Sequence, residues 1–149
     1  MDNGLSALIV VGDFHAKVCE FLVDGAVSRL VSYCSDVKYE IVAVPGALEI
    51  PPALAFAIMS DRERYDGYIA LGCILKGKTQ HNDHVARSVY SSMGDIAVQH
   101  AVPLGTGVIT AENIELALER ADVNRLNVGG SAASAMLRMV ELYRRFLGQ

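Results

Sequence analysis

The sequence predicts an α/β fold with a parallel sheet that helices cover on both faces. Apolar runs rich in β-branched residues alternate along the chain with segments whose apolar residues recur at helical spacing. A run that is apolar at nearly every position is typical of a strand buried on both faces, as in a parallel sheet. Because this alternation continues along the whole chain without an internal repeat, we expect a single domain over residues 1–149.

Four strands are predicted, each from a short apolar run. The first, LSALIVV, ends at a Gly-Asp pair, and the second, YEIVAV, is stopped by Pro45 and Gly46. The third and fourth are YDGYIALG and VPLGTGVIT. The predicted strands cover residues 5–11, 39–44, 65–72 and 102–110.

Five helices are predicted between and after these strands. Residues 15–34 carry apolar side chains at helical intervals, and the apolar segment 50–59 has prolines in its first turn, where a helix tolerates them. The last helix has basic residues near its end, which suits the negative end of the helix dipole. The predicted helices cover residues 15–34, 50–59, 81–101, 111–121 and 129–147.

Composition excludes several classes of protein. The 149 residues are 52% hydrophobic and carry a net charge of -4, with no stripe of Lys and Arg for nucleic acid. The first apolar run is too short for a membrane span and lacks the basic start of a signal peptide. Three cysteines without a CxxC pair indicate neither a disulfide framework nor a thiolate zinc site. We therefore expect a cytoplasmic protein that binds neither nucleic acid nor a membrane.

Ligands of open parallel sheets bind at the carboxyl ends of the strands. The segments that leave those ends are GDFHAK, VPGALEIPP, GCILKGKTQHNDH and TGVITAEN. In the first, Phe14 either stacks on a planar heterocycle or folds back over the helix. In the second, Gly46 permits a backbone conformation that other residues avoid, and Glu49 either accepts hydrogen bonds from ligand hydroxyls or complements the helix N-terminus.

The third segment carries the richest pattern. Gly77, Lys78 and Thr79 precede a predicted helix, where free N–H groups, a lysine and a hydroxyl suit an anion such as phosphate. The alternative for Thr79 is an ordinary N-cap. His81 follows in the first helical turn, where its imidazole can move protons near neutral pH.

A metal site is the less favoured interpretation of HNDH. His81 and His84 are three residues apart, but no HExxH motif or cysteine partner supplies a third ligand. We expect Asp83, His84 and His100 on a solvated helix face. Arg120 ends a predicted helix and is either a surface residue or a phosphate ligand.

Taken together, the motifs resemble one enzyme family. VPGALEIPPAL, ALGCILKGKTQH, GVITAENIELALERA and a glycine-initiated, alanine-rich last helix follow in the order and spacing of 6,7-dimethyl-8-ribityllumazine synthases. The resemblance implies a flavodoxin-like three-layer α/β/α sandwich around a four-stranded parallel sheet. It implies condensation of 5-amino-6-(D-ribitylamino)uracil with 3,4-dihydroxy-2-butanone 4-phosphate, the penultimate step of riboflavin synthesis. The family uses no metal and no organic cofactor for this reaction.

The resemblance also assigns residues to the pyrimidine substrate. Phe14 is similar to the aromatic residue that stacks on the ring. A second group holds the ribityl chain and the ring edge, and a third contacts the pyrimidine through its backbone. The second group is Ala47, Leu48 and Glu49, and the third is Cys73, Ile74 and Leu75.

Other positions match the family's phosphate and proton-transfer residues. Lys78 and Thr79 correspond to the loop that holds the phosphate of the butanone substrate, and His81 to the proton-transfer histidine. Thr106 and Arg120 correspond to a ring contact and a phosphate ligand that the neighbouring subunit supplies. The resemblance therefore implies a homo-oligomer, either a pentamer or a sixty-subunit shell of pentamers.

The chain departs from the family's pattern at several positions. Asn82, His84 and Thr106 replace aromatic residues that are common in the family, and Asn124 and Val128 replace lysines. Phosphate binding then depends on Arg120 and Lys78, with Arg125 as a substitute. Two rival classes remain: a flavodoxin-like module that binds a nucleotide or flavin without catalysis, and a metal hydrolase built on His81, Asp83 and His84.

Overall fold

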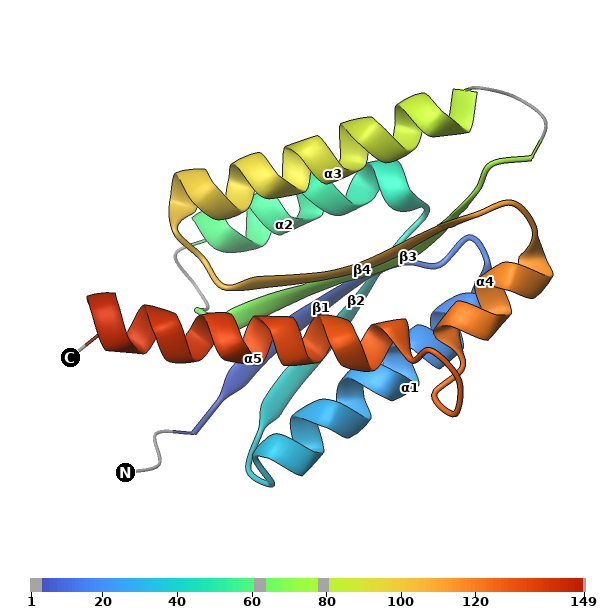
Figure 1. Cartoon of the computed structure of the whole chain (residues 1–149). Helices are drawn as coiled ribbons and strands as arrows, with labels where there is room; N and C mark the ends of the chain where they lie inside the picture. Colours follow the sequence, from blue (N-terminus) through green and yellow to red (C-terminus); the bar gives the residue numbers. More distant parts are fainter. Residues whose placement is uncertain (1–3, 61–63, 78–80, 149) are drawn as a thin grey trace.

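The chain folds into three layers, with a central sheet between two layers of helices (Figure 1). The computed structural model describes residues 4–60, 64–77 and 81–148, and at His81 it describes the backbone alone. Strands and helices alternate in the predicted order, so the α/β class and the parallel sheet are confirmed.

The sheet has four strands, all parallel, in the order β2-β1-β3-β4. Strands β1 and β3 occupy the centre and are buried almost throughout, as their continuous apolar runs predicted. Strand β2 is largely exposed because it forms an edge of the sheet. The strands span Ser6–Gly12 (β1), Lys38–Val44 (β2), Gly67–Leu75 (β3) and Leu104–Ala111 (β4).

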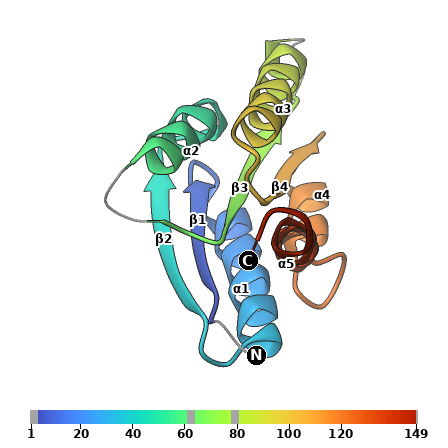
Figure 2. The same ribbon diagram turned by 90° about the vertical axis from the view of Figure 1, so that its left-hand side faces the viewer.

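Helices α1 (Ala16–Tyr33), α4 (Ile114–Ala121) and α5 (Val128–Leu147) cover one face of the sheet (Figures 1 and 2). Side chains of a strand alternate between the two faces, so every second residue of β1, such as Ile9, packs into this layer. Leu22 and Met136 from the helices are fully buried against these strand residues.

Helices α2 (Ile50–Met59) and α3 (His81–His100) cover the opposite face. Leu8 and Val10 of β1 point into this layer and meet Ile50 and Leu54 of α2. Helix α3 buries Val89 and Met93 here, while its outer face is polar. A short 3-10 turn, η1 (Ala47–Glu49), connects β2 to α2.

The element bounds agree with the prediction to within two residues except at the start of α4 and the end of β3. Helix α4 begins at Ile114, three residues after the predicted start, because β4 continues to Ala111 and Asn113 caps the helix. Strand β3 continues to Leu75, three residues beyond the predicted end, because Gly72 through Leu75 pair with Val108 through Ala111 of β4. Gly72 and Cys73 are not residues typical of a strand, so the sequence pattern did not predict this extension. In the described part of the chain, no helix has the length and apolar character that a membrane span requires.

Candidate functional site

A cavity of about 490 Å³ opens at the carboxyl ends of the strands. It takes residues from the segments that follow β1 and β2, from the end of β3 and from the start of α3. All seven of the predicted pyrimidine and ribityl residues line it: Phe14, Ala47, Leu48, Glu49, Cys73, Ile74 and Leu75. Three of the four segments picked from the sequence therefore meet in one place.

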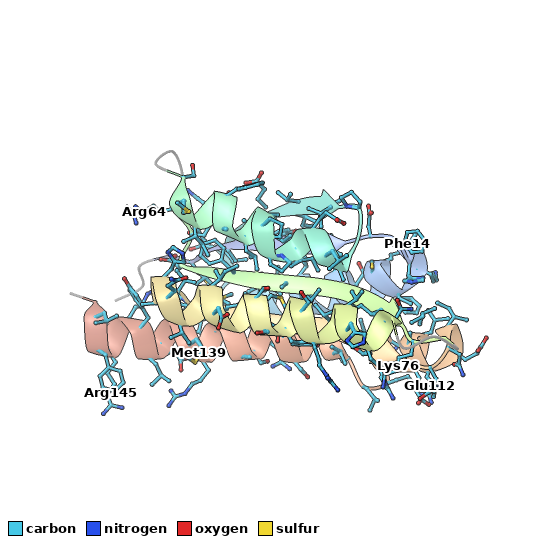
Figure 3. The ribbon with its side chains drawn as sticks, turned by 90° about the horizontal axis from the view of Figure 1, so that it is seen from above. Phe14, Arg64, Lys76, Glu112, Met139 and Arg145 are labelled. Atoms are coloured by element: carbon cyan, nitrogen blue, oxygen red, sulfur yellow. The ribbon has the colours of Figure 1, made fainter. Side chains whose placement is uncertain are left out.

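Phe14 presents its ring to solvent at the mouth of this cavity. Its side chain is 78% exposed, which excludes the alternative that it folds back over α1. The ring of His15 packs edge-to-face against it at a centroid distance of 4.9 Å. Figure 3 shows Phe14 at the same end of the molecule as Lys76, and Arg64 and Arg145 at the other. Partial burial lowers the pKa of His15, so its imidazole is mainly neutral at pH 7.

Turn η1 forms a second wall of the cavity. The Glu49 carboxylate is exposed and makes no capping hydrogen bond with α2, although Glu49 occupies the N-cap position. Gly46 does not adopt the unusual backbone conformation that glycine permits, because its φ of -159° is extended. The close approach instead occurs at Gly12, where a Cβ atom would lie 2.8 Å from the carbonyl carbon of Gly46.

The end of β3 forms the floor. Cys73 and Ile74 are buried, and Leu75 is partly buried. Burial raises the pKa of the Cys73 thiol to about 12, with a smaller contribution from Cys19. A thiol with such a pKa stays protonated at neutral pH, so Cys73 contributes shape rather than a nucleophile.

The start of α3 closes the cavity with Asn82 and Val85. The Asn82 amide donates to the backbone carbonyl of Leu75 and, at 3.5 Å, to that of Lys76. The predicted phosphate residues Lys78 and Thr79 lie outside the described residues. His81 is the first residue of α3, but the position of its side chain is likewise outside what the structure describes.

Thr106 and Arg120 are not among the described residues that line the cavity. Thr106 is exposed on β4, at an edge of the sheet. Arg120 is half-buried on α4, and its Nη1 donates to the carbonyl of Thr110 at 2.8 Å. One nitrogen of the guanidinium is thus anchored to β4, and among the described residues its other N–H groups have no hydrogen-bond acceptor.

The positions where two lysines are replaced lie near α4. The backbone N–H of Asn124 donates to the Asp122 carboxylate, and Val128 begins α5. Arg125 pairs with Glu119 on the surface, so its guanidinium already has a carboxylate partner.

The structure arranges the remaining polar residues of HNDH on the helix surface. Asp83 and His84 are exposed, and the Asp83 carboxylate pairs with Lys76 at 3.7 Å. His100 is exposed at the far end of α3. Among the described residues, no three His, Cys, Asp or Glu side chains are grouped as metal ligands.

Sequence reasoning did not assign His15, Asn82 or Val85 to the cavity. For Asn82, its spacing from the apolar residues of α3 could have indicated that it faces the core. It stands three, seven and eleven residues before Val85, Val89 and Met93, which form the core-facing stripe of α3. A polar residue on such a stripe needs a hydrogen-bond partner, and here the end of β3 supplies it.

Comparisons with known proteins agree with this arrangement. Residues 4–144 match the family model described as 6,7-dimethyl-8-ribityllumazine synthase. Proteins with that name from Bartonella tribocorum and Bartonella henselae are 43% and 42% identical to the chain, over 93% and 95% of it and 90% of each relative. A Rhizobium meliloti protein named 6,7-dimethyl-8-ribityllumazine synthase 1 is 41% identical over 93% of the chain and 91% of its own length. The family and the enzyme class expected from the motifs are thereby confirmed, and the chain belongs to the 6,7-dimethyl-8-ribityllumazine synthase family.

Proposed function

We propose that the chain condenses 5-amino-6-(D-ribitylamino)uracil with 3,4-dihydroxy-2-butanone 4-phosphate to give 6,7-dimethyl-8-ribityllumazine, releasing phosphate and water. The observation that carries this proposal is the cavity at the carboxyl ends of the strands. It gathers an exposed aromatic ring, a carboxylate without a capping partner and the end of a buried strand. These are the groups that a planar pyrimidine with a polyhydroxyl chain requires.

In this proposal each wall of the cavity binds one part of the pyrimidine substrate. Phe14 stacks on the ring, which a solvent-exposed aromatic face can do without moving other side chains. Glu49, with Ala47 and Leu48, accepts hydrogen bonds from the ribityl hydroxyls. The backbone of Cys73, Ile74 and Leu75 contacts the ring edge.

The butanone phosphate binds beside the start of α3. Lys78 and Thr79 hold its phosphate, and His81 transfers protons next to it. Support comes from the elements on either side of these residues in the chain: β3 ends at the floor of the cavity, and α3 begins at its edge with a helix N-terminus.

The reaction then needs few groups from the protein. The 5-amino group attacks the ketone, and the carbinolamine loses water to form an imine. Elimination of phosphate leaves an enol that tautomerises to a ketone. The ribityl-bearing nitrogen attacks this ketone, and the second carbinolamine loses water as the second ring is completed. Holding the two reactants in register supplies much of the acceleration, with effective molarities of up to about 10⁵–10⁸ M for well-oriented pairs. Proton transfer by a histidine adds about 10²–10⁴-fold.

The site is completed by a second copy of the chain, which supplies Thr106 and Arg120, and five copies form a ring. Two observations support this. Neither residue is among the described residues that line the cavity of its own chain. Arg120 lies beside the carboxyl end of β4, and only its bond to Thr110 is made to a described residue. The whole chain, residues 1–149, acts as one such domain in the cytoplasm, where the thiols of Cys19, Cys34 and Cys73 stay reduced.

The test is an assay of lumazine formation with the two purified substrates, on protein whose size is measured by light scattering. Release of phosphate and lumazine in equal amounts from an assembled protein would support the proposal. Affinity for the pyrimidine without product would overturn it and favour a binding module. Turnover that needs a metal, detected by elemental analysis and chelator treatment, would favour the hydrolase.

A further inference from the structure

Asn82, in the first turn of α3, is hydrogen-bonded to the end of β3. Its amide nitrogen donates to the carbonyl of Leu75, the last residue of β3, and at 3.5 Å to the carbonyl of Lys76. Lys76 is itself anchored, since its N–H donates to the carbonyl of Ala111 at 2.8 Å. A single side chain on α3 therefore contacts a strand end that pairs with β4.

In this chain, the position of Asn82 allows hydrogen bonds that an apolar side chain could not make. Its side chain is half-buried at the edge of the cavity, on the same face of α3 as Val85, Val89 and Met93. An apolar residue there would continue the core-facing stripe but would remove the hydrogen bonds to the carbonyls of Leu75 and Lys76. An aspartate of the same shape would place a carboxylate, which only accepts hydrogen bonds, against two carbonyl oxygens.

His81 opens α3 and is the neighbour of Asn82 in the chain. We propose that Asn82 is a positioning residue that fixes the first turn of α3 against the end of β3, and with it the proton-transferring residue His81. This inference rests on the proposed function, because it assigns Asn82 a role only through His81. A misplacement of about 1 Å in a reacting group can cost about 10²-fold in rate, so one side chain that sets this register has a large effect.

The test compares kcat and KM for wild type, Asn82→Ala, Asn82→Asp and one control variant at a neighbouring residue. We expect both variants to lower kcat by about 10- to 100-fold while KM for the pyrimidine changes little. The control is Asp83→Asn, which removes the exposed pair with Lys76 and leaves Asn82 in place. Because exposed ion pairs contribute little, we expect Asp83→Asn to keep wild-type turnover.

A double-mutant cycle with His81→Ala separates positioning from a general loss of structure. If Asn82 acts through His81, Asn82→Ala lowers kcat no further in the His81→Ala background. Equal reductions in both backgrounds would overturn the inference, as would an unchanged kcat in Asn82→Asp. If wild type is active and either of these results is found, only the role of Asn82 is overturned and the proposed function stands. A wild type that forms no lumazine overturns the proposed function, and the inference with it.

Discussion

Cys73 illustrates how a single residue in the cavity is kept out of the chemistry. Cys73 is 7% exposed, and burial raises the pKa of its thiol to about 12. Burial and the charge of Asp13 raise the pKa of the Cys19 thiol to about 11. The unfolded chain loses these protons at an ordinary thiol pKa of about 8.5. Both thiols thus bind protons more tightly in the folded state than in the unfolded state.

We therefore expect the free energy of unfolding to fall as the pH rises above about 8.5, through the folded-state values of about 11 and about 12. Below the unfolded-state pKa the contribution is fully present. Unfolding by urea at pH 7, 9 and 10 measures the slope, which should flatten in Cys73→Ala. Cys34→Ala is the control, since Cys34 lies outside this buried pair. Equal slopes in Cys73→Ala and wild type would contradict the expectation.

His81 and His84 lie one turn apart at the start of α3. Comparing variants of the two residues distinguishes a catalytic role of His81 from an effect of charge on the helix surface. We expect His81→Ala to lower kcat by about 10²-fold or more and to leave measurable turnover, because orientation of the substrates persists without the proton carrier. His84 is exposed, so His84→Ala should keep wild-type kcat. Steady-state kinetics on both variants decide this. A His81→Ala enzyme as fast as wild type would remove His81 from the mechanism.

At the scale of elements, α1 packs closely against α5 in the helical layer that these two helices form with α4. Gly129 lies in the first turn of α5, and a Cβ atom there would meet the carbonyl oxygen of Leu22 at 2.0 Å. No flexible side chain can move aside, because the contact is with the backbone of α1. The two helices touch so closely only because residue 129 has no side chain.

Gly129→Ala should therefore destabilise the fold by about 1–3 kcal/mol, the usual cost of overpacking. Gly94 on α3 is the matched control, since a Cβ atom there meets nothing within 4 Å. Gly94→Ala should stabilise by about 0.5–1 kcal/mol, because alanine favours the helix. Thermal unfolding midpoints at one protein concentration compare the three proteins. A Gly129→Ala protein as stable as wild type would show that α1 and α5 can separate at little cost.

At the scale of the whole molecule, the proposed site is divided between two copies of the chain. One copy supplies the cavity with Phe14, and its neighbour supplies Arg120. This division predicts complementation between two defective variants. In a mixed ring, an Arg120→Ala chain still has an intact cavity, and a Phe14→Ala neighbour still supplies Arg120.

We expect Phe14→Ala and Arg120→Ala chains, unfolded and refolded together in equal amounts, to recover about a quarter of wild-type activity, the share of sites with both intact parts in a random ring. The control mixes Phe14→Ala with His81→Ala, whose defects both lie in the cavity half. That mixture should show no recovery beyond the average of its components. Failure of the first mixture, with rings confirmed by light scattering, would contradict a shared site.

The sequence by itself determined the order of elements, the parallel sheet and the segments that leave its carboxyl edge. Continuous apolar runs and helical spacing are local patterns, and they predicted the type and order of the four strands and the α-helices. The four motifs also gave the family, which the comparisons confirm. Seven predicted site residues line one cavity, because the ends of parallel strands converge whatever the connecting loops contain.

Tertiary structure alone decided the features that depend on pairing and close approach. The extension of β3 to Leu75 comes from its pairing with β4, and the need for glycine at residue 12 comes from the approach of Gly46. The raised pKa of Cys73 follows from burial, which spacing along the chain does not report. The hydrogen bonds of Asn82 likewise exist because α3 lies across the end of β3. Each of these brings together residues from separate elements, whereas a sequence pattern records only neighbours along one element.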